Sequence, residues 1–205
     1  YPVVGLLIIG LFMCLINPIV GAINTALYSG LEAMGEGSKI VLGIVLAGMM
    51  AVDMGGPFNK AAYVFGTSTL AAMAAGQGSD IMAAVMIGGM VPPIAIALAT
   101  TFFKNRFTAD ERKSGVVNYI MGLCFITEGA IPFAAGDPLH VLPACIVGSG
   151  VAGALSMAFG CALPAPHGGI FVFPVMTNVG GYLVALVVGS LVGMVLLGIL
   201  KKKKV

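Results

Sequence analysis

The sequence has little charge and no tryptophan. Only 9% of its 205 residues are charged, against roughly a quarter in an average soluble domain. The hydrophobic share is 59% and the mean hydropathy is +1.07, which together exclude a soluble globular protein. A net charge of +2 with 8% aromatic residues also excludes a nucleic-acid-binding surface. The chain therefore belongs in a lipid bilayer, with no nucleic acid as partner.

Several kinds of chemistry are missing as well. The sequence contains no phosphate-binding P-loop, no HExxH zinc motif and no GxSxG nucleophile motif. ATP hydrolysis by this chain is therefore not expected. The cysteines stand in apolar stretches without CxxC spacing, which favours packing thiols over metal ligands or a disulfide framework. We expect no metal and no cofactor. The four cysteines are Cys14, Cys124, Cys145 and Cys161.

Long apolar segments occupy most of the chain. A helix needs about 20 apolar residues to cross a hydrocarbon core roughly 30 Å thick, so there is room for about six or seven crossings. The 30 glycines favour close helix packing and interruptions within lipid. We predict an all-α polytopic transmembrane helix bundle with broken helices and re-entrant hairpins, in a single domain unit spanning 1–205. The apolar segments are 3–26, 40–75, 81–103, 115–135, 139–163 and 179–200.

Eight of the ten positive charges lie in two places, four in the loop 104–114 and four in the tail 201–205. The positive-inside rule places both in the cytoplasm. The chain between them must then cross the membrane an even number of times, yet it contains three apolar stretches. Either one stretch does not cross, or 164–174 helps to form another pass. A re-entrant hairpin with its tip at 128–132 is the simplest answer.

Glycine and proline break the apolar segments in three places. Two glycines precede a proline within 53–60, and proline lacks a donor and restricts the residue before it. Further breaks surround Glu128 and His167, and Pro92-Pro93 predicts a kink. Irregular backbone at membrane depth is tolerated only inside protein or beside a water-filled cavity, so the breaks indicate a substrate pathway. The expected breaking residues are Gly55, Gly56, Pro57, Gly129, Pro132, Pro166, Gly168 and Gly169.

Ionisable residues within apolar segments are functional candidates because charge at the bilayer centre is costly. Glu128 has no Lys or Arg within ten residues on either side. Its carboxylate either contacts substrate, for example by accepting bonds from sugar hydroxyls, or finds a distant cation. Asp53 and Lys60 either pair across their turn, or Asn59 and Lys60 face a polar ligand.

The remaining candidates follow the second and third breaks. Asp137 precedes Pro138, so a turn is as good an explanation as a ligand contact. His140 is explained equally well by a position at the membrane interface as by a functional role. His167 stands on irregular backbone, where a lone histidine is more often structural. A metal enzyme that gathers these groups with Glu128 is disfavoured, because their spacing matches no motif.

Three stretches together resemble a known family. The segment from Asp53 to Ala62 (DMGGPFNKAA), that from Phe125 to Ala134 (FITEGAIPFA) and that from Leu163 to Phe171 (LPAPHGGIF) are similar to the membrane domain, enzyme IIC, of the bacterial phosphotransferase-system fructose permease. Order and spacing agree too, with Asp137-Pro138-Leu139 after the second stretch. The resemblance covers essentially the whole chain, as about the second half of that domain.

The resemblance implies group translocation. Fructose or a related hexose would be carried inward across the bacterial cytoplasmic (inner) membrane and phosphorylated on the cytoplasmic side. The phosphoryl group would come from phosphoenolpyruvate through a phosphohistidine (IIA) and a phosphocysteine (IIB) domain, neither present in these residues, so whether this chain counts as an enzyme stays open. Further implied partners are the missing N-terminal IIC helices and, in a homodimer, a second copy.

On the family pattern Glu128 is the first sugar-binding candidate, with Asn59, Lys60 and His167 in support, and Asp53 and Asp137 follow. An alternative is an ion-coupled secondary sugar transporter that uses Glu128 and Asp53 as coupling carboxylates. A membrane scaffold without transport would leave the buried carboxylates and the three breaks unexplained.

Overall fold

The computed structural model describes residues 2–33, 39–74 and 76–203. Within these ranges it is helical, with two isolated β-bridges and no longer strand. The predicted all-α fold is therefore confirmed, although the last two residues of the predicted basic tail lie outside the described ranges. The elements are α1 (Pro2–Ala33), α2 (Lys39–Val52), α3 (Pro57–Ala71), α4 (Asp80–Phe102), η2 (Lys104–Arg106), α5 (Ala109–Leu123), η3 (Thr127–Ala130), α6 (Ile131–Gly136), α7 (Pro138–Ala158), η4 (Gly169–Val175) and α8 (Val179–Leu200).

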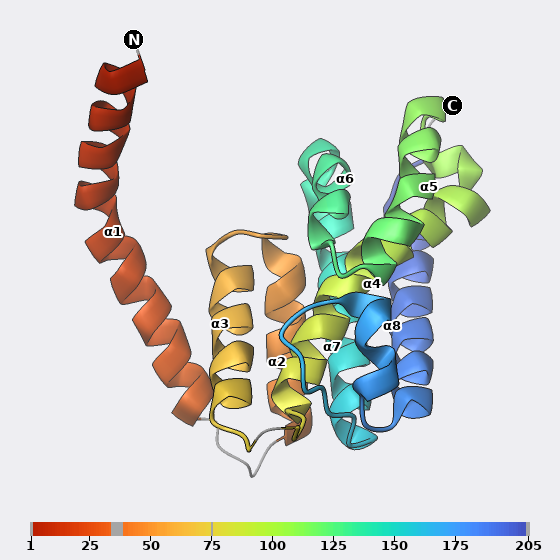
Figure 1. Cartoon of the computed structure of the whole chain (residues 1–205). Coiled ribbons are helices and arrows are strands. Elements are labelled where there is room, and N and C mark those ends of the chain that lie inside the picture. Colours follow the sequence, from red (N-terminus) through yellow and green to blue (C-terminus); the bar gives the residue numbers. More distant parts are fainter. Residues whose placement is uncertain (1, 34–38, 75, 204–205) are drawn as a thin grey trace.

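The centre of the molecule is a bundle of α2, α4, α7 and α8 (Figure 1). Among the described residues α4, α7 and α8 are long and apolar enough to span a membrane. The composition leaves room for about six or seven crossings. Helices α2 and α3 are shorter, with 14 and 15 residues, and the apolar stretch 115–135 is divided among α5, η3 and α6. Glycines let these helices approach closely. A methyl group on Gly148 of α7 would lie 2.8 Å from the carbonyl oxygen of Gly189 on α8.

The bundle has two distinguishable ends. At one, called the basic end, the Arg106 guanidinium donates a hydrogen bond to the carbonyl of Lys201, so the basic loop and the basic tail lie together. At the other, called the Ser79 end, Lys39 pairs with Asp80 at 3.3 Å. The common position of the loop and the tail agrees with the parity argument made from the sequence.

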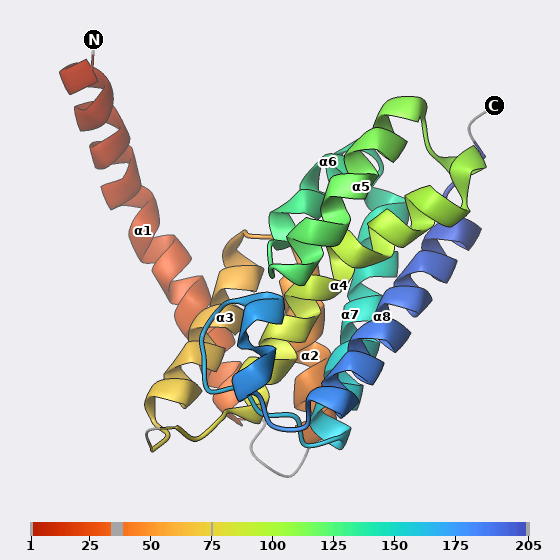
Figure 2. The same cartoon turned by 45° about the vertical axis from the view of Figure 1, so that its right-hand side comes forward.

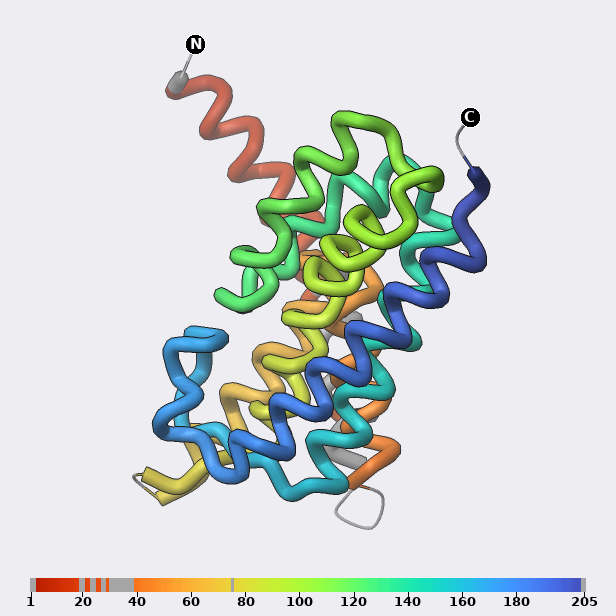
Figure 3. Tube along the Cα trace, turned by 90° about the vertical axis from the view of Figure 1, so that its right-hand side faces the viewer, coloured from red at the N-terminus to blue at the C-terminus, as the bar shows by residue number. Residues whose placement is uncertain are grey.

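Three hairpins enter the bundle from these ends (Figures 2 and 3). The α2–α3 hairpin starts and finishes at the Ser79 end, where Thr69 and Ser79 share a hydrogen bond of 2.8 Å. The α5–α6 hairpin starts and finishes at the basic end, so the apolar stretch 115–135 turns back instead of crossing. The 159–178 hairpin closes at the Ser79 end, where the Asn178 amide donates to the carbonyl of Phe159 at 2.7 Å.

The first break is shorter than expected. Helix resumes at Pro57 and not after residue 60, because proline is tolerated in the first helical turn, where its missing N–H has no partner to lose. Asp53 accepts hydrogen bonds from the backbone N–H groups of Phe58 at 2.7 Å and Asn59 at 2.9 Å. Its carboxylate thus satisfies two of the free donors at the start of α3.

Helix α4 is unbroken through Pro92-Pro93, the position at which the sequence predicts a kink. Prolines have no N–H, so the carbonyls of Gly88 and Gly89, four residues earlier, lose their helical donors. The Ser149 hydroxyl from α7 donates to Gly88 O and the Thr127 hydroxyl from η3 donates to Gly89 O, both at 2.8 Å. Neighbouring side chains therefore replace the bonds that the prolines remove.

Candidate functional site

The tips of the three hairpins meet one another. Glu128 on η3 lies against Gly55 in the α2–α3 break, where an added methyl group would be 3.1 Å from Glu128 Oε1. The ring centroids of Phe125 and His167 are 4.8 Å apart. Gly169 lies so close to Leu123 that a methyl group on it would be 2.1 Å from the Leu123 carbonyl oxygen. The three breaks predicted from the sequence are thus brought together.

Two glycines make this meeting possible. Gly55 has φ +118° and Gly169 has φ +56°, backbone conformations that residues with a side chain rarely adopt. Each also leaves space that the opposing hairpin tip fills. Glycine is therefore required at both positions by conformation and by proximity.

Glu128 is exposed, and its carboxylate forms no hydrogen bond or ion pair with any residue the structure describes. It lies in the one-turn helix η3, between the buried Thr127 and Gly129. Thr127 fixes this turn to α4 through Gly89. The carboxylate therefore extends from a turn that is anchored to α4, and its oxygens are free to accept hydrogen bonds from a ligand.

Two aromatic residues at the site were not singled out from the sequence. Phe125 is buried with φ 62°, a strained conformation for an aromatic residue. Its ring contacts His167 and lies 6.3 Å, centroid to centroid, from that of Tyr63 on α3. The only sequence signal for Phe125 is its place at the start of the second family-like stretch, and Tyr63 has none.

The polar residues of the first break have different roles. The Asn59 side chain is buried and donates to the carbonyl of Met50 at 2.8 Å, which fastens α3 to α2. Lys60 is exposed, with Nζ 6.0 Å from the Tyr63 ring centroid. No ion pair joins Asp53 to Lys60 in the described part of the chain, so the pairing considered from the sequence is not formed.

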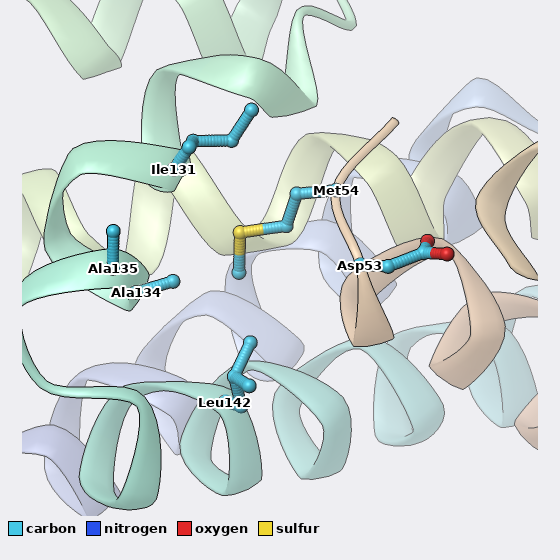
Figure 4. A pocket seen from close by; sticks show the side chains of 6 residues that line it. All are labelled: Asp53, Met54, Ile131, Ala134, Ala135 and Leu142. Carbon is cyan, nitrogen blue, oxygen red and sulfur yellow. The ribbon is translucent and has the colours of Figure 1, made fainter. Parts of the chain in front are cut away.

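A pocket of about 210 Å³ lies between the first break and the second arm of the α5–α6 hairpin. Figure 4 shows that the Asp53 carboxylate points away from it. The pocket therefore offers mainly apolar surface, and polar contacts must come from the hairpin tips. Its lining residues are Asp53, Met54, Ile131, Ala134, Ala135 and Leu142.

Asp137 is not part of this meeting point. It lies beyond the other end of α6, where it bonds His140 Nδ1 at 2.5 Å and Lys201 Nζ at 3.2 Å. Burial by itself would raise the pKa of Asp137, but the hydrogen bonds from His140 and Lys201 outweigh burial and hold the pKa below its usual value of 3.8. No three His, Cys, Asp or Glu side chains in the described ranges could together hold a metal ion.

Residues 2–148 match the family described as phosphotransferase system, EIIC. The chain belongs to the EIIC family. It is 50% identical over 203 residues to the PTS system fructose-specific EIIABC component of Bacillus subtilis, covering 98% of this chain and 31% of the relative. Similarity to the fructose permease IIC component of Bacillus amyloliquefaciens is also 50% identity over 203 residues, with 98% and 65% covered.

A third relative, the PTS system fructose-specific EIIB'BC component of Escherichia coli, is 47% identical over 208 residues, which cover 100% of this chain and 36% of the relative. This EIIC chain thus spans between about a third and two thirds of the length of these relatives. No solved structure matches it.

Proposed function

We propose that this EIIC chain is part of the sugar-translocating membrane subunit of a phosphoenolpyruvate-dependent phosphotransferase system. It binds fructose or a related hexose and carries it inward for phosphorylation by a partner domain. The single observation that carries the proposal is the free Glu128 carboxylate at the meeting point of three hairpin tips. The names of the similar fructose-specific components support the choice of sugar.

Glu128 is suited to a sugar because a carboxylate accepts hydrogen bonds from two neighbouring hydroxyl groups at once. His167 and Lys60 remain the supporting candidates, together with the side-chain oxygen of Asn59, whose amide nitrogen already donates to Met50. Asp53 orients the backbone beside them. Tyr63 and the apolar pocket supply surface for the carbon face of the ring, the usual mixture in small-molecule sites. A site where discontinuous helices meet between the two ends of the bundle suits alternating access.

The phosphoryl chemistry belongs to partners in this proposal. EIIA and EIIB domains carry the phosphoryl group, and this chain orients the sugar and excludes water from it. The composite names EIIABC and EIIB'BC of two relatives agree with such partners. A homodimer, completed by further IIC helices, would cover apolar side chains that α1 exposes, among them Leu6, Leu11 and Leu15. Figures 1 and 2 show α1 leaning away from the bundle.

The location that fits this function is the bacterial cytoplasmic (inner) membrane, crossed several times with the basic end inside. Single cysteines placed at 105 and at 202 of a permease lacking native cysteines test this. Both are expected to react with an impermeant maleimide only after the inner face is exposed. Labelling from opposite faces would contradict the orientation and remove the parity argument.

The function itself is tested with membranes that carry the complete permease and its phosphoryl carriers. Fructose phosphate is expected with phosphoenolpyruvate as donor and not with ATP. Membranes with the Glu128→Gln permease serve as the control. Accumulation of free fructose under a proton or sodium gradient, without phosphorylation, would overturn the proposal and favour the ion-coupled secondary transporter.

A further inference from the structure

Lys201 is the one lysine in the described ranges that is almost completely buried. Its side chain is 2% exposed, whereas its neighbours Lys202 and Lys203 are exposed. A buried ammonium group is costly unless opposite charges compensate for the lost water. The buried ammonium group at the C-terminal end of α8 therefore needs opposite charges close by.

The compensating carboxylates come from the two arms of one hairpin. Lys201 Nζ lies 3.5 Å from Glu111 Oε1, in the first turn of α5, and 3.2 Å from Asp137 Oδ2, directly after α6. One cation on α8 thus joins the start and the end of the α5–α6 hairpin.

Further contacts surround this cluster. Lys201 Nζ lies 5.1 Å from the Phe107 ring centroid, and Phe107 packs edge-on against Phe133 of α6 at 6.4 Å. Arg106 donates to the Lys201 carbonyl, and His140 bonds the second oxygen of Asp137's carboxylate. The two carboxylates that pair with Lys201 in the described residues therefore both belong to the hairpin, and His140 of α7 joins the cluster through Asp137.

We propose that Lys201 is a positioning residue for Glu128: it fixes both arms of the α5–α6 hairpin to α8 and so sets where the hairpin tip stands. This inference rests on the proposed sugar-binding function of the tip. Lys201 does not touch the sugar. It acts because α6 is only six residues long, so a tilt at the base of the hairpin is passed directly to η3.

The experiment uses the complete permease in membranes and compares Lys201→Met with Lys201→Arg and with Lys202→Met, a matched control in the same tail. Fructose affinity and backbone hydrogen exchange are measured for each. Lys201→Met is expected to weaken fructose binding on the order of tenfold, since one partner of a buried charge cluster is removed. It should also accelerate exchange in 127–137 and leave the buried part of α4 unchanged.

Lys201→Arg retains the cation and is expected to keep most of the affinity, and Lys202→Met should match the unmodified protein. A charge exchange, Lys201→Glu with Asp137→Lys, should bind better than Lys201→Glu alone, because the cation then lies between two carboxylates again. If Lys201→Met fails to insert, the milder Asp137→Asn provides the same two readouts.

Normal affinity with unchanged hairpin exchange in Lys201→Met would overturn the proposal, as would equal effects of Lys201→Met and Lys202→Met. Accelerated exchange with normal affinity would also overturn it, because the base would then not position the tip. If the unmodified permease bound no fructose, the proposed function would fail, and unchanged exchange in the variant would separately refute the attachment of the hairpin.

Discussion

The charged side chains at the base of the α5–α6 hairpin are paired, whereas the one at its tip is unpaired among the described residues. At the base, Glu111, Asp137, His140 and Lys201 form a mutually compensated cluster. At the tip, Glu128 stands without an ion partner among the described residues, although three hairpins surround it. A carboxylate in an apolar sequence is therefore not enough to indicate a binding site, because some carboxylates hold the fold and others are left free for a ligand.

The largest effect is expected at the tip. Glu128→Gln should abolish measurable fructose binding, with a loss on the order of a hundredfold or more, because the amide keeps the shape but loses the charge-assisted hydrogen bonds. Equilibrium binding to the purified permease measures this, with the exposed Asp110→Asn at the base as control. Unchanged affinity in Glu128→Gln would remove the distinction between tip and base.

Gly169→Ala should separate two of the hairpin tips. The added methyl group would meet the Leu123 carbonyl oxygen at 2.1 Å, on a backbone with φ +56°. Gly160→Ala is the matched control, since Gly160 has φ +62° and nothing within 4 Å, so it carries the conformational strain alone. Strain of this kind costs about 1–3 kcal/mol, and thermal unfolding in detergent should show a clearly larger loss for Gly169→Ala. Equal losses would mean that the tips are not in close contact.

Thr127→Val should loosen the tip without touching Glu128. The Gly89 carbonyl would lose its donor, at a cost of about 1–3 kcal/mol for a buried acceptor. Ser149→Ala deprives the neighbouring Gly88 carbonyl in the same way, but from α7. Both variants should lower the melting temperature, while only Thr127→Val should speed hydrogen exchange in 127–130. Faster exchange there in both would argue against a specific anchor for the tip.

The smallest effect concerns the base in acid. Because the folded-state pKa of Asp137 lies below 3.8, its ionisation contributes stability that is complete above the unfolded pKa. This contribution is lost as pH falls below about 3.8 and through the lower folded value. Melting temperatures measured from pH 7 to pH 3 should therefore fall less steeply for Asp137→Asn than for the unmodified protein. Parallel curves would show that the base cluster contributes no pH dependence.

The sequence was most informative where structure is decided locally. Gly55, Gly56 and Pro57 end one helix and begin the next by their own backbone restrictions, and the apolar run 179–200 coincides with α8. The hairpin at 115–135 followed from charge placement and parity. In the first two cases the residues that decide the structure are neighbours in the chain. In the third, the positive-inside rule depends only on where the positive charges lie along the chain.

What could not be predicted depends on partners far away in sequence. Lys201 and Asp137 are 64 residues apart, and nothing in either neighbourhood indicates that they pair. Phe125 and His167 meet through two separate hairpins. Asn59 was expected to face a ligand, but its amide nitrogen donates a hydrogen bond to the Met50 carbonyl because α3 folds back on α2. Such assignments require the packed structure.

The two adjacent prolines of α4 have a consequence for how the hairpin can move. The Gly89 carbonyl has no donor from its own helix and depends on Thr127. A small withdrawal of the hairpin would leave that oxygen without a partner in apolar surroundings, whereas full withdrawal would open room for water to reach it. Intermediate displacements are therefore penalised more than either extreme, which favours two discrete positions of the hairpin over a gradual slide.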